Sequence, residues 1–222
     1  MPYRQTDRVR RRLAERHAAI LGAAEALAAE SGLQAVQIVP VARRAGIAAG
    51  TVYRYFPAKT DLVAALIKRV ADADMTAMRD AANAAPGASS ALSASIVTFA
   101  ARALRQPRLS WAVLAEPIDP DLGPVRSEFR KMLAGHIEQN LRTAIERGSL
   151  PAQDAAVTAA AIVGALLEGL LGPLAPRHEA EAVKRRDAIQ TLTLFALRGA
   201  GVMDARARGL VVQTALIEEH DR

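Results

Sequence analysis

The chain has 222 residues, 51% of them hydrophobic and 4% aromatic, which is enough for one large helical domain or two smaller ones. It contains no cysteine, which excludes disulfides, thiolate metal sites and thiol nucleophiles. Its four histidines lack the spacing of metal ligands, and the sequence shows no Gly-rich phosphate loop and no nucleophile–base pair. We therefore expect no metal, no cofactor and no enzymatic activity.

The net charge of +6 is concentrated near the N-terminus. Residues 1–60 hold ten Lys or Arg and four Asp or Glu, whereas the rest of the chain holds 19 of each sign. Such an excess is typical of a surface that contacts a polyanion, although a solvated basic face gives the same count. The sequence has no signal-peptide pattern, and its most apolar charge-free run, 155–167, is too short to span a bilayer. These features predict a soluble, cytoplasmic protein without a membrane partner.

The first sixty residues predict three helices. Apolar residues from Leu13 to Ala28, with His17 on the same face, recur at helical spacing, so a first helix is expected over about 10–30, ended by Gly32. A shorter helix follows and ends at Gly46, and Pro40 must lie in its first turn, where no backbone N–H is needed. A third helix is expected over about 48–56, because Pro57 terminates it.

Two short helices joined by a Gly-containing turn indicate a helix-turn-helix, whose second helix fits the major groove of DNA. Val52 and Phe56 are four residues apart and are expected to face inward. The residues between them are then left exposed or flanking: Thr51, Tyr53, Arg54 and Tyr55. Tyrosine hydroxyls bind phosphates without reading sequence, whereas Thr and Arg can reach base edges. Each residue alone also has a plain explanation, as half-buried packing or as a solvated surface group.

The stretch "VARRAGIAAGTVYRYFPAKTDLVAAL" resembles the N-terminal DNA-binding domain of the TetR family of bacterial transcriptional regulators. The resemblance covers about residues 11–66. It implies phosphate contacts from Tyr53, Tyr55 and Lys59. It implies base or groove contacts from Ala49, Gly50, Thr51 and Arg54. We add the preceding basic pair, Arg43 and Arg44, to the expected DNA contacts.

The sequence departs from the family pattern at three helix caps. Gln37, Ala48 and Ala58 stand where Ser or Thr usually begins the second, third and fourth helices. Each missing cap should cost about 1 kcal/mol. It also removes a hydroxyl that often touches phosphate, which puts phosphate contacts from positions 37 and 48 in doubt.

The remaining chain predicts an all-α fold, because no segment alternates at period two. We divide it into a helix-turn-helix domain, 1–56, and a helical domain for ligand binding and dimerisation, 57–222. The helix 57–84 is expected to connect the two. Further helices are expected at about 90–106, 108–115, 123–147, 154–172, 179–199 and 203–220.

The middle helices carry the large groups that suggest an effector pocket: Phe99, Trp111, Leu114, Phe129, Met132 and His136. Each of them can equally be ordinary core, and His136 can be a hydrogen-bonded core histidine. Glu116 is the acid expected near such a pocket. The family resemblance implies a homodimer through helices 154–172 and 179–199, although both can also be interior helices of one subunit.

The leading hypothesis is therefore a homodimeric DNA-binding regulator. The resemblance favours a repressor that leaves a near-palindromic operator when a small molecule binds. Two alternatives are a small helical enzyme and a helical protein at the membrane surface. Arg10, Arg11 and Arg12 are interpreted as an arm preceding the first helix, which either enters the minor groove or is a disordered tail.

Overall fold

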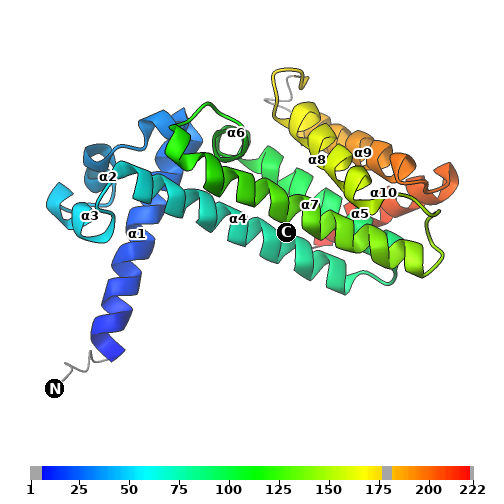
Figure 1. The fold of residues 1–222 in the computed structure, drawn as a ribbon, viewed down its shortest axis with the longest axis horizontal. Coiled ribbons are helices and arrows are strands. Elements are labelled where there is room, and N and C mark those ends of the chain that lie inside the picture. Colours follow the sequence, from blue (N-terminus) through cyan, green and yellow to red (C-terminus); the bar gives the residue numbers. More distant parts are fainter. Residues whose placement is uncertain (1–6, 177–181, 221–222) are drawn as a thin grey trace.

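The computed structural model describes residues 7–176 and 182–220, and every regular element in these ranges is helical (Figure 1). In chain order the elements are α1 (Asp7–Ser31), η1 (Leu33–Ala35), α2 (Ile38–Arg44), α3 (Ala49–Tyr55), α4 (Lys59–Ala84), α5 (Ala88–Arg105), α6 (Pro107–Leu114), η2 (Pro120–Leu122), α7 (Gly123–Glu146), α8 (Ala155–Leu170), α9 (Ala182–Gly199) and α10 (Asp204–His220). The all-α fold class is confirmed, and the expected helices differ from the observed ones only at their ends.

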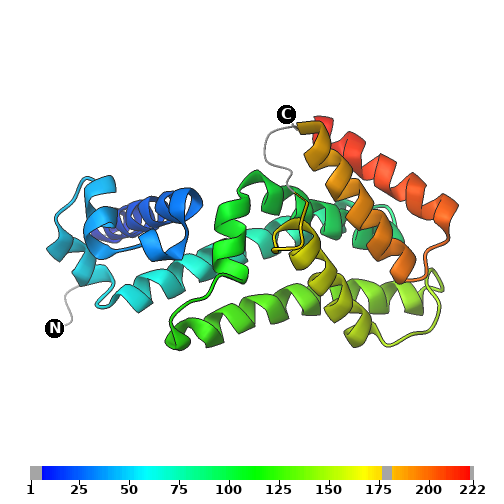
Figure 2. The same cartoon turned by 90° about the horizontal axis from the view of Figure 1, so that it is seen from above.

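The helices α1, α2 and α3 form one end of the molecule, and α8, α9 and α10 form the other (Figures 1 and 2). The long helices α4, α5 and α7 run between these ends and pack along one another. None of the helices in the described ranges is long and apolar enough to cross a membrane.

Helix α4 runs from the α1–α3 end of the molecule toward the α8–α10 end, and it buries one face along its whole length. Its 26 residues span about 39 Å. Leu62, Leu66 and Met78 on this face are all less than 2% exposed. The buried core is continuous from Ile20 in α1 to Val211 in α10. The division of the chain at residue 56 therefore remains a prediction.

The first half of α1 projects beyond the rest of the molecule, and this corrects one expectation (Figure 1). Leu13 lies on the expected apolar face, yet it is 38% exposed, and His17 is exposed as well. Burial begins at Ile20, and the buried part of the helix packs against α2, α4 and α6. Helical periodicity identifies the apolar face but does not show where the neighbouring helices end.

The missing helix caps predicted from the sequence are confirmed for α2 and α3. Neither Gln37 nor Ala48 makes a side-chain hydrogen bond to the first turn of its helix. Helix α4 is half capped, because the Asp61 carboxylate accepts a hydrogen bond from the Ala58 N–H at 2.9 Å while Ala58 itself has no side-chain acceptor. Pro40 lies in the first turn of α2, as required.

Replacing Ala48 by serine should raise the melting temperature by about 2 to 4 °C, because a hydroxyl at the N-cap of α3 satisfies a free N–H and contributes about 1 kcal/mol. Ala48 is exposed and has the extended backbone of an N-cap, so the serine fits. Thermal unfolding followed by circular dichroism measures the change. Ala14→Ser, at an exposed position inside α1, is the control and should not stabilise. An unchanged melting temperature for Ala48→Ser would show that another group already binds those donors.

Candidate nucleic-acid interface

Helices α2 and α3 form the helix-turn-helix predicted from the sequence. The turn is closed by Gly46, whose φ of 66° lies in the left-handed region. Its N–H donates to the Arg43 carbonyl at 3.2 Å, and the Ile47 N–H donates to the Ala42 carbonyl at 3.0 Å. Two hydrogen bonds thus end α2 and direct the chain into α3.

The expected anchors of α3 are confirmed. Val52 is fully buried and Phe56 is 4% exposed, both within the core that includes Val41 and Ala42 of α2. Because these anchors fix a helix of only seven residues, the direction of its other side chains is also fixed.

The opposite side of α3 presents the residues expected to contact DNA. Tyr53 is 52% exposed, Arg54 and Gly50 are exposed, and Ala49, Thr51 and Tyr55 are half-buried. Lys59 is exposed at the first position of α4. Within the described residues, no hydrogen bond or ion pair holds the side chains of Tyr53, Arg54 or Lys59. These groups are therefore available to a partner.

The basic pair at the end of α2 is divided between two roles. Arg44 donates from Nη1 and Nη2 to the two Glu30 oxygens, at 2.8 and 2.6 Å, and so ties α2 to α1. The hydrogen bond to Glu30 raises the pKa of Arg44, which keeps the guanidinium charged. Arg43 is exposed and has no such partner in the described chain. Arg43 therefore fits the predicted DNA contact better than Arg44 does.

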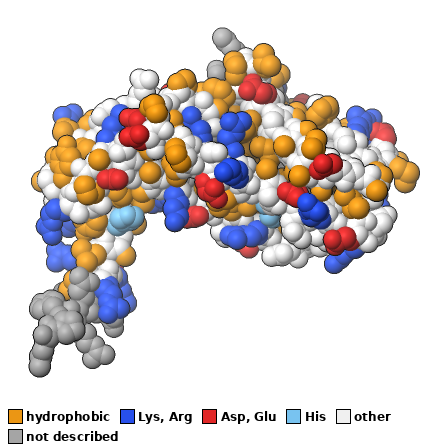
Figure 3. Space-filling model, in the orientation of Figure 1, with side chains coloured by type: hydrophobic (Ala, Val, Ile, Leu, Met, Phe, Trp, Pro, Cys, Tyr) orange, Lys and Arg blue, Asp and Glu red, His pale blue; other side chains and the backbone are white. Residues whose placement is uncertain are grey.

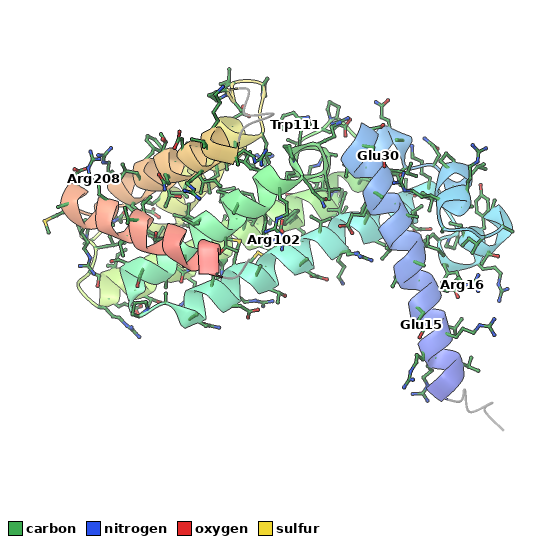
Figure 4. All side chains as sticks on the ribbon, turned by 180° about the vertical axis from the view of Figure 1, so that it is seen from behind. Glu15, Arg16, Glu30, Arg102, Trp111 and Arg208 are labelled. Atoms are coloured by element: carbon green, nitrogen blue, oxygen red, sulfur yellow. The ribbon has the colours of Figure 1, made fainter. Side chains whose placement is uncertain are left out.

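The arginines assigned to a preceding arm lie inside α1, which begins at Asp7, and this corrects the prediction. Arg10, Arg11 and Arg12 are exposed on its projecting half. Figure 3 shows basic side chains on this half and on the adjoining side of the helix-turn-helix. Figure 4 shows Glu15 and Arg16 on the projecting part of α1 and Glu30 near its other end. Helix α1 thus extends the basic surface away from the body.

Helix α1 also contacts the end of α3 directly. The His17 ring lies 5.0 Å from the Phe56 ring and 6.3 Å from the Tyr55 ring, measured between centroids. Tyr55 is therefore partly covered by α1, whereas Tyr53 is not.

A polar junction joins the helix-turn-helix end to the bundle, and the sequence did not reveal it. Glu116, which follows α6, accepts the Leu33 N–H at 3.0 Å through Oε2 and the Arg108 Nη2–H at 2.7 Å through Oε1. Arg108 also donates to the Ser31 carbonyl at 3.2 Å. The chain passes beneath these groups at Gly32, whose φ is 81°. Both oxygens of Glu116 bind this junction, and its expected place near an effector pocket stays a prediction.

Arg126 of α7 supports the same junction from the other side. Its side chain donates to the Val113 carbonyl at 3.2 Å and to the Ala112 carbonyl at 3.0 Å, at the end of α6. Burial lowers the pKa of Arg126, and the charge of Glu116 opposes that change. A continuous set of polar contacts thus runs from α7 through α6 to α1.

The proposed pocket residues lie in the middle of the bundle. Phe99, Leu114 and Phe129 are at most 2% exposed, Met132 packs against the core, and Trp111 is half-buried. His136 Nε2 lies 2.9 Å from the buried Ser95 hydroxyl and 3.2 Å from the Asn140 amide nitrogen. That these groups line an effector pocket stays a prediction. The described residues also include no group of three or more His, Asp or Glu side chains able to hold a metal ion.

The stability of the protein should fall as the pH drops below about 6.5, because burial and, secondarily, Arg79 lower the pKa of His136. Below that pH the unfolded chain binds a proton at His136 that the folded state does not, so protonation favours unfolding. Denaturant unfolding at pH 7.5 and pH 5.5 measures the loss, which His136→Gln should reduce. His17→Gln leaves His136 in place and should keep the loss. An equal loss in the His136 variant would contradict the assignment.

Helices α8 and α9 leave a band of small and apolar residues exposed. On α8 the exposed positions include Val157, Ala160 and Ala161. On α9 Phe195 is 59% exposed. Gly169 of α8 approaches Leu192 of α9 so closely that a Cβ at position 169 would lie 2.9 Å from the leucine methyl groups. The two helices therefore form one close-packed layer, whose outer side exposes these small and apolar residues beside charged ones such as Asp187 and Arg198.

Comparisons with known proteins agree with this description. The profile of "Bacterial regulatory proteins, tetR family" matches residues 20–66. The HTH-type transcriptional repressor KstR of Rhodococcus jostii (strain RHA1) is 49% identical over 55 residues, which are 25% of this chain and 26% of that protein. KstR of Mycobacterium tuberculosis is 47% identical over 55 residues, 25% of each chain. The matched segment thus spans about a quarter of the length of these curated relatives.

Solved structures match over most of the chain. RolR in complex with resorcinol has a TM-score of 0.65 at 20% identity, covering 90% of this chain and 95% of that one. FadR from Bacillus subtilis in complex with stearoyl-CoA has a TM-score of 0.70 at 20% identity, covering 84% and 98%. A regulatory protein of the tetR family from Rhodococcus RHA1 has a TM-score of 0.67 at 18% identity, covering 85% and 98%.

At these identities the structural likeness shows the fold alone. The sequence match is more specific, and it coincides with the observed helix-turn-helix and its buried anchors. Residues 20–66 therefore match the helix-turn-helix segment of the tetR family of bacterial regulatory proteins.

Proposed function

We propose that the protein is a homodimeric transcriptional repressor that binds a near-palindromic operator and is released by a small molecule. The observation that carries the proposal is the outer side of α3, where Tyr53 and Arg54 are exposed without an intramolecular partner on a helix anchored by Val52 and Phe56. Curated relatives that share this segment are named transcriptional repressors.

In this proposal residues 1–56 bind DNA and residues 57–222 form the effector and dimerisation domain, with α4 as the connector. Tyr53, Tyr55, Lys59 and Arg43 bind phosphates and fix the position of α3. Thr51 and Arg54 meet base edges in the major groove, and Ala49 and Gly50 allow the backbone to come close.

The apolar band on α8 and α9 supports a dimer with a second copy of the chain. Val157, Ala160 and Phe195 would meet their counterparts across a two-fold axis. A dimer is also what the chemistry requires, because one seven-residue helix reads few bases. Two copies placed one helical turn of DNA apart, about 34 to 36 Å, would read two half-sites.

The effector would bind among Phe99, Trp111, Leu114, Phe129, Met132 and His136. An apolar small molecule with one or two polar groups suits this lining. Resorcinol and stearoyl-CoA, the ligands of two structural neighbours, differ too much to narrow the class. Release from DNA requires only that the ligand prefer the state that does not bind DNA, and DNA must then weaken ligand binding by the same factor.

Selection of duplexes from a randomised pool by the purified protein tests the proposal. We expect a near-palindromic winner, bound by two chains with an affinity that falls steeply with salt. No enrichment, together with only weak salt-dependent binding, would overturn the proposed function.

The projecting half of α1 should contribute to this affinity through charge. Replacing Arg10, Arg11 and Arg12 together by glutamine should weaken binding and reduce the slope of log K against log salt by about 0.9 for each phosphate that is no longer neutralised. The control, Arg130→Gln with Lys131→Gln and Arg147→Gln, removes the same charge from exposed positions at α7. Equal binding by the two triple variants would remove α1 from the interface.

A further inference from the structure

A solvent-open cavity of about 210 Å³, lined by both polar and apolar groups, lies where α1, α4, α5 and α6 meet. It is separate from the proposed effector pocket and from the outer side of α3. Its wall contains three arginines, Arg69, Arg102 and Arg105, and two acids, Glu25 and Asp74. Figure 4 shows Arg102 near the middle of the molecule, between α1 and the C-terminal helices.

The two acids satisfy only part of the arginine donors. Arg102 uses Nε to bind Asp74 Oδ1 at 2.6 Å, which leaves both of its terminal nitrogens without a partner in the described chain. Arg69 contacts Glu25 at 3.1 Å through Nε and donates to the Ala18 carbonyl at 3.2 Å through Nη1, which leaves Nη2. Arg105 has no partner at all among the described residues. Since a guanidinium carries five N–H donors, most of the donors at this cavity remain open.

Asp74 anchors Arg102 at one side of the cavity. It is 7% exposed, and burial raises the pKa of its carboxyl against the opposing effect of Arg102. The short bond to Arg102 holds that guanidinium in place, with its free end available to a ligand. Gln106 and Ser110 add neutral polar groups from the start of α6.

From this geometry we propose that the cavity is a second ligand site, which binds the oxyanion group of a small anionic molecule. Arginine forks fit the oxygens of phosphate and carboxylate, and the three arginines exceed the two acids by one positive charge, which an anion would balance. The volume is below the usual range of about 300 to 1,000 Å³ for whole-ligand pockets, so the site suits a compact anion or a headgroup.

Because the site lies between α1 and α4, an anion bound there should change DNA binding. This expectation rests on the proposed function. An anion at Arg69 competes with Glu25, whose ion pair ties α1 to α4. Loosening that tie changes how α1, which packs against both α2 and α4, holds the helix-turn-helix. We therefore expect an anion that occupies the cavity to weaken operator binding beyond the effect of its ionic strength.

The test measures binding of two probes, inorganic phosphate and citrate, by calorimetry and by the fluorescence of Trp111, which adjoins Ser110. The ionic strength is held constant with sodium chloride, and no DNA is present. We expect saturable binding by wild type and at least tenfold weaker binding by Arg105→Gln. Arg105 is exposed and unpaired within the described chain, so its replacement should not disturb folding. Comparison of the affinities for phosphate and for citrate shows whether the site prefers a phosphate or a carboxylate ligand.

Two control variants complete the test. Arg147→Gln removes an exposed arginine at the end of α7 and should bind like wild type. Arg54→Gln removes an arginine of the DNA-facing side of α3 and should also bind like wild type. No saturable binding of either probe, equal binding by Arg105→Gln, or loss of binding in Arg54→Gln would overturn the proposed site. None of these outcomes depends on whether an operator exists.

Discussion

Replacing Gly32 by alanine should lower the free energy of unfolding by about 3 to 5 kcal/mol. Gly32 has φ 81° and ψ −178°, a region that only glycine occupies without strain. A Cβ there would lie 1.9 Å from Arg108 Nη2 and 2.7 Å from Glu116 Oε2. The arginine and the carboxylate must therefore move, which breaks or displaces the hydrogen bonds that join α6 to α1.

About half of this cost comes from the Leu33 N–H. This donor is buried, and Glu116 is the group that accepts it. An unsatisfied buried donor costs about 1 to 3 kcal/mol, to which the backbone strain adds about as much. The side chain of Arg108 is 39% exposed, so the loss of its ion pair adds little.

Chemical denaturation of Gly32→Ala measures the effect, and Gly46→Ala is the matched control. Gly46 also has a positive φ, 66°, but a Cβ there meets nothing within 4 Å. It should therefore show only the backbone strain, about 1 to 2 kcal/mol. If both variants lose the same stability, the close approach at Gly32 contributes nothing. A double variant, Gly32→Ala with Arg108→Ala, should recover the part that is due to the collision with Arg108.

The contrast between Gly32 and the helix-turn-helix shows what the sequence can predict. The turn at Gly46, the Val52–Phe56 spacing and the stop at Pro57 are local signals within about a dozen residues, and each determines structure near itself. The bond between Leu33 and Glu116 joins residues 83 positions apart. No periodicity or spacing in the sequence relates them, because the contact exists only after α6 packs on α1.

Two further residues show the same limit. Arg44 looks like a free basic group in the sequence, but Glu30, 14 residues earlier, binds it bidentately. Leu13 continues the apolar face of α1, but the body of the protein ends before it. The sequence therefore predicts where a helix forms and which of its faces is apolar. The pairing of charges and the extent of burial depend on how the helices pack.

Replacing Tyr53 by phenylalanine should weaken operator binding at least about 100-fold. The hydroxyl is expected to donate to a DNA phosphate, and a hydrogen bond to a charged group contributes about 1.5 to 3 kcal/mol. A dimer loses the bond twice. Since 1.4 kcal/mol corresponds to a factor of ten, two such bonds account for this loss.

The loss should not come from misfolding. Tyr53 is 52% exposed and has no hydrogen-bond partner in the described chain, so its hydroxyl does not stabilise α3. Thermal unfolding of Tyr53→Phe should therefore match wild type. Tyr53→Ala also removes the ring and should bind DNA no better than the phenylalanine variant. Arg147→Gln, on the far end of α7, controls for unrelated surface changes.

Tyr53 and its neighbour Arg54 should differ in what their replacement does to DNA binding: one change lowers affinity, and the other lowers sequence preference. A phosphate contact carries no sequence information, so Tyr53→Phe should weaken all duplexes alike and select the same winning sequence. Arg54→Ala should instead relax the preference at one position in each half-site, at a cost of about 1 to 3 kcal/mol. Duplex selection with both variants measures these outcomes. Unchanged affinity in Tyr53→Phe, or an altered winning sequence, would contradict the phosphate contact and leave α3 positioned on DNA by other groups.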